Sequence, residues 1–147
     1  MVTCGADKSI RLWNADNGTL IKKIDQQVSD ALYSVDFSPD GSKIIAGGLG
    51  KTWHLWNTGE DAPLKTVPGH SDHIYRTLFN SAGTRIATLG YAGNFMVWNA
   101  ADGNQLFAQQ LPVSTTYSFA YAPDGKSVAF GTIDNKVILF TLPPSAQ

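Results

Sequence analysis

The sequence predicts an all-β fold built from a repeated unit of 42 residues. Each unit contains short apolar runs that are rich in β-branched and aromatic residues and are separated by turn residues. This pattern is typical of strands. Internal periods of this size indicate units that each bury an apolar face against the next unit. Three sets of residues recur in steps of 42: Phe37, Phe79 and Tyr121; Gly41, Gly83 and Gly125; and Trp56, Trp98 and Phe140.

The clearest copy of the unit runs from Ser34 to Asn57, with the sequence SVDFSPDGSKIIAGGLGKTWHLWN. Its SPDG segment predicts a tight turn between two strands, because Pro39 fixes one backbone angle and Gly41 can adopt a positive φ. The segment GGLGK forms a second turn before the next strand and is no phosphate-binding loop, since no helix follows it.

Fourteen strands are expected, in four groups along the chain. The first group comprises 2–6, 9–14 and 19–26, and the second comprises 31–37, 43–48, 52–56 and 63–67. The third group comprises 73–79, 85–89, 94–98 and 105–111, and the last comprises 115–121, 127–131 and 136–141. The corresponding repeat units are 1–27, 28–69, 70–111 and 112–147.

The FSPDG turn, the following strand of small residues and the Leu-Trp-Asn ending resemble the WD repeat. That family usually opens a repeat with Gly-His, as at His70, and ends the third strand of a repeat with Trp-Asp, where this chain has Trp-Asn at Trp13, Trp56 and Trp98. Repeats of this family form the four-stranded antiparallel blades of a β-propeller. The resemblance covers nearly the whole chain and implies a partial β-propeller of about three and a half WD-type blades.

Aligned with the family, residues 1–27 supply the second to fourth strands of a blade, and residues 112–147 supply the first three. Propellers of the family close their last blade with a strand from the N-terminus. The leading expectation is therefore the C-terminal half of a seven-bladed propeller, and the alternative is a ring assembled from two or more chains. The alternative fits poorly, because a chain that ends with the third strand of a blade would have to be continued by one that begins with a fourth strand, and this chain begins with a second strand. We expect the chain alone to be marginally stable or to associate, since open apolar faces and edge strands would meet water.

Three tyrosines, Tyr33, Tyr75 and Tyr117, share one position on the predicted innermost strands. The resemblance implies that this position lies at the upper rim of the central channel, where partners bind, and we place His73 and Tyr91 on the same rim. Tyrosine suits an interface because it offers a large apolar ring and a hydroxyl at low entropic cost. The alternative is that the tyrosines are kept only as copies of one duplicated unit and fit a half-exposed strand.

The WD family often links four groups by hydrogen bonds: the His of Gly-His, a Ser or Thr on the second strand, an Asp in the turn before the third strand, and the Trp. Ala92 stands at the Asp position of the repeat that has both His70 and Trp98, and no repeat has the full set. We therefore expect aromatic packing to stabilise the fold more than this network does. The resemblance assigns these residues to structural WD-type positions: Trp13, Trp56, Trp98, His70, Asp7 and Asp134.

Composition and motifs argue against several other classes of protein. A net charge of −1, from 11 basic and 12 acidic residues, gives no long-range attraction for nucleic acid or an anionic membrane. Cys4 is the only cysteine, so no intrachain disulfide can form. His70 and His73 have only Asp72 as a third ligand nearby, so we predict no metal, no cofactor and no catalytic residues. With no apolar N-terminal run, the expected compartment is the cytoplasm.

The predicted function is a non-catalytic protein-protein interaction scaffold that binds a protein or peptide at the propeller rim. Fold alone does not fix function. The alternative is that these repeats are the propeller portion of a larger multidomain enzyme or signalling receptor whose active domain lies outside this chain. A propeller that is itself a metal-dependent enzyme would require close to one bound metal per chain.

Overall fold

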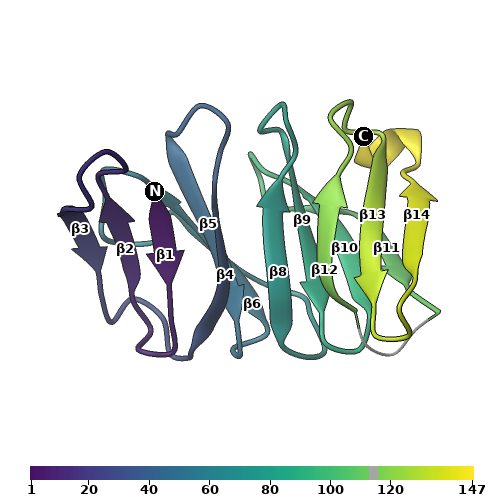
Figure 1. Ribbon diagram of the computed structural model, residues 1–147, viewed down its shortest axis with the longest axis horizontal. Helices are drawn as coiled ribbons and strands as arrows, with labels where there is room; N and C mark the ends of the chain where they lie inside the picture. The colour runs from purple at the N-terminus through teal and green to yellow at the C-terminus, as the bar shows by residue number, and fades with distance from the viewer. Residues whose placement is uncertain (113–115) are drawn as a thin grey trace.

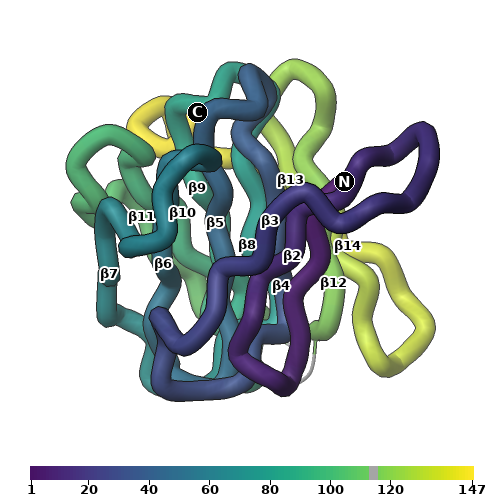
Figure 2. Tube along the Cα trace, turned by 90° about the vertical axis from the view of Figure 1, so that its left-hand side faces the viewer, coloured from purple at the N-terminus to yellow at the C-terminus, as the bar shows by residue number. Residues whose placement is uncertain are grey.

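The computed structural model describes residues 1–112 and 116–147 and has an all-β architecture. The described residues form fourteen strands in four antiparallel sheets. The sheets stand one after another in an open row rather than a closed ring (Figure 1). In the view along that row, the outer strands β7 and β11 lie at one side and the innermost strands β4, β8 and β12 lie toward the other (Figure 2).

Each sheet is a simple meander, in which strands that follow one another along the chain are paired. The first sheet contains β1 (Val2–Cys4), β2 (Ile10–Trp13) and β3 (Leu20–Ile24). The second contains β4 (Leu32–Phe37), β5 (Lys43–Gly48), β6 (Thr52–Asn57) and β7 (Lys65–Pro68). The third contains β8 (Ile74–Phe79), β9 (Arg85–Gly90), β10 (Asn94–Asn99) and β11 (Gln105–Gln110). The last contains β12 (Thr116–Tyr121), β13 (Ser127–Thr132) and β14 (Val137–Thr141), and a 3₁₀ turn at Pro144–Ala146 follows it.

The predicted all-β fold of three- and four-stranded antiparallel sheets is confirmed, with strand ends that differ by one to a few residues. The predicted start of the last group, residue 115, lies outside the described residues. The boundaries proposed for the repeat units stay predictions.

The apolar core lies in the spaces between consecutive sheets. Ile44 and Ile45 on β5 are both fully buried, the first against the first sheet and the second against the third sheet. Adjacent residues of a strand point to opposite faces, so a strand covered on both sides is apolar without alternation. Between the second and third sheets, the rings of Trp53 and Trp98 meet edge to face at 5.7 Å.

The last sheet has one uncovered apolar face. Val137 and Leu139 on β14 are 72% and 78% exposed. They pair with β13 at the positions that Trp53 and Leu55 occupy in the second sheet, where both residues are fully buried. The last sheet of the row therefore exposes a face that, in the second sheet, is covered by the next sheet.

We expect this face to drive self-association of the isolated chain. Replacing Leu139 with aspartate should lower the average mass toward the 15.8 kDa of one chain, because an unpaired carboxylate is costly to bury in an apolar contact. Size-exclusion chromatography with light scattering across a concentration series measures this. Leu64→Asp, at an exposed leucine directly before β7, is the control and should leave the mass unchanged. A wild-type chain that stays monomeric at every concentration contradicts the expectation.

Candidate functional site

The three repeated tyrosines lie where the pairing of each innermost strand slips. The register of β4 against β5 shifts between Leu32 and Ser34, which leaves Tyr33 as an extra residue. The same shift occurs at Tyr75 in β8 and at Tyr117 in β12. An extra residue of this kind is a β-bulge, which bends the strand and re-aims the side chain. The bulges thus give the three tyrosines a common geometry that neighbouring strand residues do not have.

Four tyrosines lie together where the innermost strands begin, and the ring of Tyr75 contacts the other three. The ring of Tyr33 stacks on it at 5.5 Å, and the ring of Tyr117 meets it edge-on at 5.3 Å. The ring of Tyr91, which directly follows β9, lies 5.7 Å away. We call this set the tyrosine platform: Tyr33, Tyr75, Tyr91 and Tyr117.

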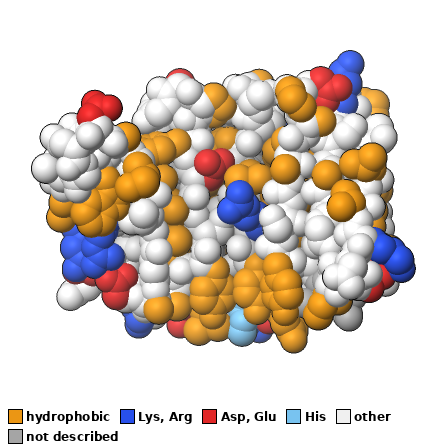
Figure 3. Space-filling model, in the orientation of Figure 1, with side chains coloured by type: hydrophobic (Ala, Val, Ile, Leu, Met, Phe, Trp, Pro, Cys, Tyr) orange, Lys and Arg blue, Asp and Glu red, His pale blue; other side chains and the backbone are white. Residues whose placement is uncertain are grey.

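The tyrosine platform is open to solvent. Tyr33, Tyr91 and Tyr117 are 45%, 43% and 51% exposed. Hydrophobic side chains gather at the lower edge of the space-filling view, around the start of β8, with a histidine beside them (Figure 3). Desolvation raises the pKa of Tyr75, and the three other tyrosines and Asp72 raise it further. The Tyr75 hydroxyl therefore stays protonated at neutral pH and can donate a hydrogen bond.

His73 joins the tyrosine platform through the backbone. Its carbonyl oxygen accepts a hydrogen bond of 2.8 Å from the Tyr91 N–H, and its own N–H donates to Asp72 Oδ1 at 2.7 Å. The structure therefore brings together all five residues that the sequence analysis placed on one rim. Their role in binding stays a prediction.

Side-chain bridges between β4 and β8 hold two of the tyrosine-bearing strands in fixed relation. Ser34 Oγ accepts a hydrogen bond of 3.0 Å from the Thr77 N–H, and Asp36 Oδ2 accepts one of 3.0 Å from the Phe79 N–H. Burial raises the pKa of Asp36. The only sign of these bridges in the sequence is the alternation Ser-Val-Asp-Phe, which places two polar side chains on one face of the strand.

At the WD-type positions, the third sheet has part of the family network. The Trp98 Nε1–H donates to Thr88 Oγ1 at 2.8 Å, and His70 Nε2 shares a hydrogen bond with the same oxygen at 2.6 Å. Burial lowers the pKa of His70 to about 4, so the ring is neutral at pH 7. Within the described residues, His70 Nδ1 has no hydrogen-bond partner, and Ala92 stands where the family has a carboxylate.

The other two tryptophans at WD-type positions, Trp13 and Trp56, differ in whether the indole N–H has a hydrogen-bond partner. The Trp13 Nε1–H donates to Thr3 Oγ1 at 2.8 Å. Trp56 faces a strand on which Ala46 takes the equivalent position, and among the described residues its Nε1–H has no partner. Trp56 is nevertheless fully buried between the first two sheets, so its contribution there is apolar packing.

The two predicted turn carboxylates, Asp7 and Asp134, bind within their own turns. Asp7 forms an ion pair of 2.6 Å with Arg11, whose hydrogen bond holds the pKa of Asp7 well below its usual range. Asp134 pairs with Lys136 at 2.6 Å and accepts a hydrogen bond from the Thr132 hydroxyl, and both contacts lower its pKa. These contacts order the turns before β2 and β14.

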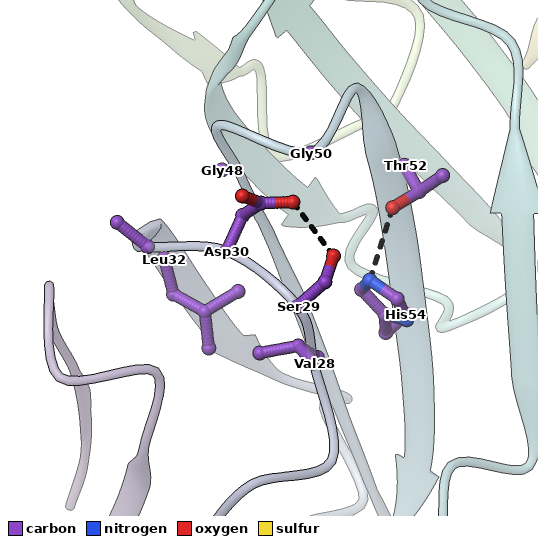
Figure 4. A pocket seen from close by; sticks show the side chains of 9 residues that line it. Val28, Ser29, Asp30, Leu32, Gly48, Gly50, Thr52 and His54 are labelled. Carbon is purple, nitrogen blue, oxygen red and sulfur yellow. Dashed lines mark hydrogen bonds between the residues drawn. The ribbon is translucent and has the colours of Figure 1, made fainter.

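Two concave regions of the described chain differ greatly in size. The pocket in Figure 4 lies beside Asp30 and His54 and has a volume of about 10 Å³, space for a single water molecule. An open groove of about 470 Å³ runs between the first two sheets, with the apolar side chains of Trp13, Ile21 and Phe37 among its walls. Among the described residues, no three His, Cys, Asp or Glu side chains gather closely enough to hold a metal ion. That part of the chain also has no helix long and apolar enough to cross a membrane.

Repeated antiparallel sheets that pack face to face, with an aromatic residue near the end of β2, β6, β10 and β14, define a protein of the β-propeller repeat class. The sequence matches the family described as WD domain, G-beta repeat, over residues 18–57 and 61–99, which together make up more than half of the chain. The chain belongs to the WD repeat family.

Several longer proteins are similar to this chain. A guanine nucleotide-binding protein subunit beta of Arabidopsis thaliana is 30% identical over 83 residues, which are 56% of this chain and 22% of that protein. An uncharacterised WD repeat-containing protein of Synechocystis sp. is 29% identical over 137 residues, or 92% of this chain and 39% of that protein. Cilia- and flagella-associated protein 52 of Sus scrofa is 24% identical over 98 residues, or 67% and 16%. The chain thus spans between 16% and 39% of the length of these relatives.

Proposed function

We propose that this chain is a non-catalytic interaction scaffold that binds a protein or peptide partner on the tyrosine platform. WD repeat domains are in general protein-interaction modules and are typically non-catalytic. The observation that carries the proposal is the contact of four tyrosines in one surface, three of them set by β-bulges at equivalent positions.

Two physical properties suit this surface to binding. Tyrosine is enriched among the residues that dominate interface energies, since its ring buries a large apolar area and its hydroxyl can pair with a polar group. The rings of Tyr33, Tyr75 and Tyr117 already pack on one another, so less side-chain freedom is lost when a partner binds.

The test begins with peptides selected from a displayed library on the wild-type chain, whose affinities are then measured for a variant with Tyr33, Tyr75 and Tyr117 replaced by serine. We expect at least about a thirtyfold loss of affinity, the effect of removing one strong interface residue. Circular dichroism should show an unchanged fold, because two of the three side chains are about half exposed.

The matched control replaces two exposed apolar residues at the opposite end of the sheets with serine: Leu20 at the start of β3 and Leu64 just before β7. This control should bind the selected peptides as the wild type does. If the tyrosine variant keeps full affinity for every selected peptide, the proposal is wrong.

A second candidate function is the propeller portion of a larger enzyme or receptor whose active domain lies outside this chain. It is favoured by the length of the relatives. Telomerase protein component 1 of Mus musculus, for example, is 27% identical over 140 residues, which are 95% of this chain but 5% of that protein. Reading the coding sequence on both sides of this chain distinguishes the two candidates.

A further inference from the structure

Carboxylates precede two of the platform tyrosines at the same spacing in the sequence. Asp30 precedes Tyr33 by three residues, and Asp72 precedes Tyr75 by three residues. Both acids lie in the loops that lead into the innermost strands β4 and β8. Asp72 is among the groups that raise the pKa of Tyr75, so its negative potential reaches the central ring of the tyrosine platform.

These two carboxylates differ from the other acids at the same end of the sheets. Asp7, Asp25 and Asp134 each form an ion pair of 2.6 Å with a lysine or arginine. Among the described residues, Asp30 and Asp72 have no lysine or arginine within ion-pair distance. Asp72, whose charge reaches Tyr75, and the equivalent residue Asp30 are therefore left without a lysine or arginine from the described chain.

The remaining partners of the two carboxylates are weak competitors for an incoming cation. Asp72 accepts the backbone N–H of His73, and the His73 ring nitrogen Nε2 lies 3.6 Å from it. Asp30 accepts a hydrogen bond from the Ser29 hydroxyl. Lys8 donates to the Ser29 carbonyl oxygen at 2.6 Å, which weakens the negative field near Asp30. Asp72 is therefore the stronger anchor of the two.

We propose that the tyrosine platform takes a polypeptide segment that presents an arginine, with the guanidinium stacked on an exposed tyrosine ring and its N–H groups directed at Asp72. The faces of aromatic rings attract cations, and a planar guanidinium can stack and donate hydrogen bonds at the same time, which a lysine ammonium cannot do. This inference rests on the proposed function and names the chemistry of the partner.

The test uses fluorescein-labelled peptides of the form Gly-Ser-X-Ser-Gly, in which X is arginine, its neutral isostere citrulline, or glutamate. Fluorescence anisotropy with the full chain measures their affinities at low and high salt. We expect the arginine peptide to bind about tenfold more tightly than the citrulline peptide, with the glutamate peptide weakest. The preference should shrink at high salt, because screening weakens the attraction between exposed charges.

Variants locate the effect on the tyrosine platform. Asp72→Asn keeps an oxygen that can accept the His73 N–H but removes the charge, and should reduce the preference for arginine over citrulline to about twofold. Asp124→Asn is the matched control, since Asp124 caps its own turn between β12 and β13 at the other end of the sheets (Figure 1). It should leave the preference unchanged.

Three results would overturn the inference: a citrulline peptide that binds as tightly as the arginine peptide, an arginine peptide that does not bind, or an arginine preference that survives Asp72→Asn. The proposed function fails separately, when library-selected peptides bind the triple serine variant as they bind the wild type. If the surface binds neutral peptides through its tyrosines, the proposed function holds and only the preference for arginine is rejected.

Discussion

Replacing Gly48 with alanine is expected to destabilise the chain by at least about 3 kcal/mol, because the added methyl has no room. A Cβ at this position would lie 2.0 Å from the carbonyl oxygen of Ala31 and 2.8 Å from the Cα of Leu32. Both are backbone atoms, and the Ala31 oxygen is held by a hydrogen bond of 2.9 Å from the Leu49 N–H. Relief therefore requires the entry to β4 to move. Urea unfolding followed by tryptophan fluorescence measures the change.

The Gly48 substitution also connects stability to the candidate site. Gly48 pairs with Leu32 at the register shift that leaves Tyr33 as the bulged residue. The matched control is Gly131→Ala on β13, where an added Cβ meets no described atom within 4 Å. We expect the control to stay within about 0.5 kcal/mol of the wild type. Equal stability of the two variants would show that the second sheet repacks around the methyl.

Replacing Thr88 with valine is expected to cost about 2–4 kcal/mol, because one hydroxyl serves two buried side chains. Thr88 Oγ1 accepts the Trp98 Nε1–H and shares a hydrogen bond with His70, and all three residues are buried. Valine fills nearly the same volume, so the loss measures the unpaired polar groups rather than a cavity. Chemical unfolding at pH 7, where His70 is neutral, gives the free energy directly.

Two comparison variants separate the hydrogen bonds from packing. Thr88→Ser keeps the hydroxyl and loses only a methyl, so its cost should be about 1 kcal/mol. Thr3→Val removes the equivalent bond to Trp13 in the first sheet, where both residues are only half-buried and water can replace the lost partner. We expect a smaller loss there than at Thr88. A Thr88→Val chain as stable as the wild type would show that aromatic packing alone holds the third sheet.

Patterns of neighbouring residues were enough to predict the fold from the sequence. The apolar runs in steps of 42 residues and the Gly-containing turns predicted fourteen strands in three- and four-stranded groups, and the described residues form these strands. The run Ile44-Ile45 shows why, since a strand covered on both faces needs no alternation of apolar and polar residues. Strand ends were less exact: the predicted strand 63–67 is Lys65–Pro68, because its start depends on pairing with β6.

The candidate site was only partly readable. The equivalence of Tyr33, Tyr75 and Tyr117 followed from the repeat period, but their mutual contact depends on how far apart adjacent sheets stand. The double role of Thr88 could not be predicted from the sequence, because the contact of its hydroxyl with both His70 and Trp98 depends on how the strands pair and pack.

The sequence by itself determined the repeat, the strands and turns, and the positions that share a face, because these depend on residues near one another in the chain. The tertiary structure alone decided which strand residues become bulges, which carboxylates find a cation and which do not, and where Tyr91 meets Tyr75. Those outcomes depend on strand register and on the approach of separate turns, and both are settled only when whole sheets pair and pack.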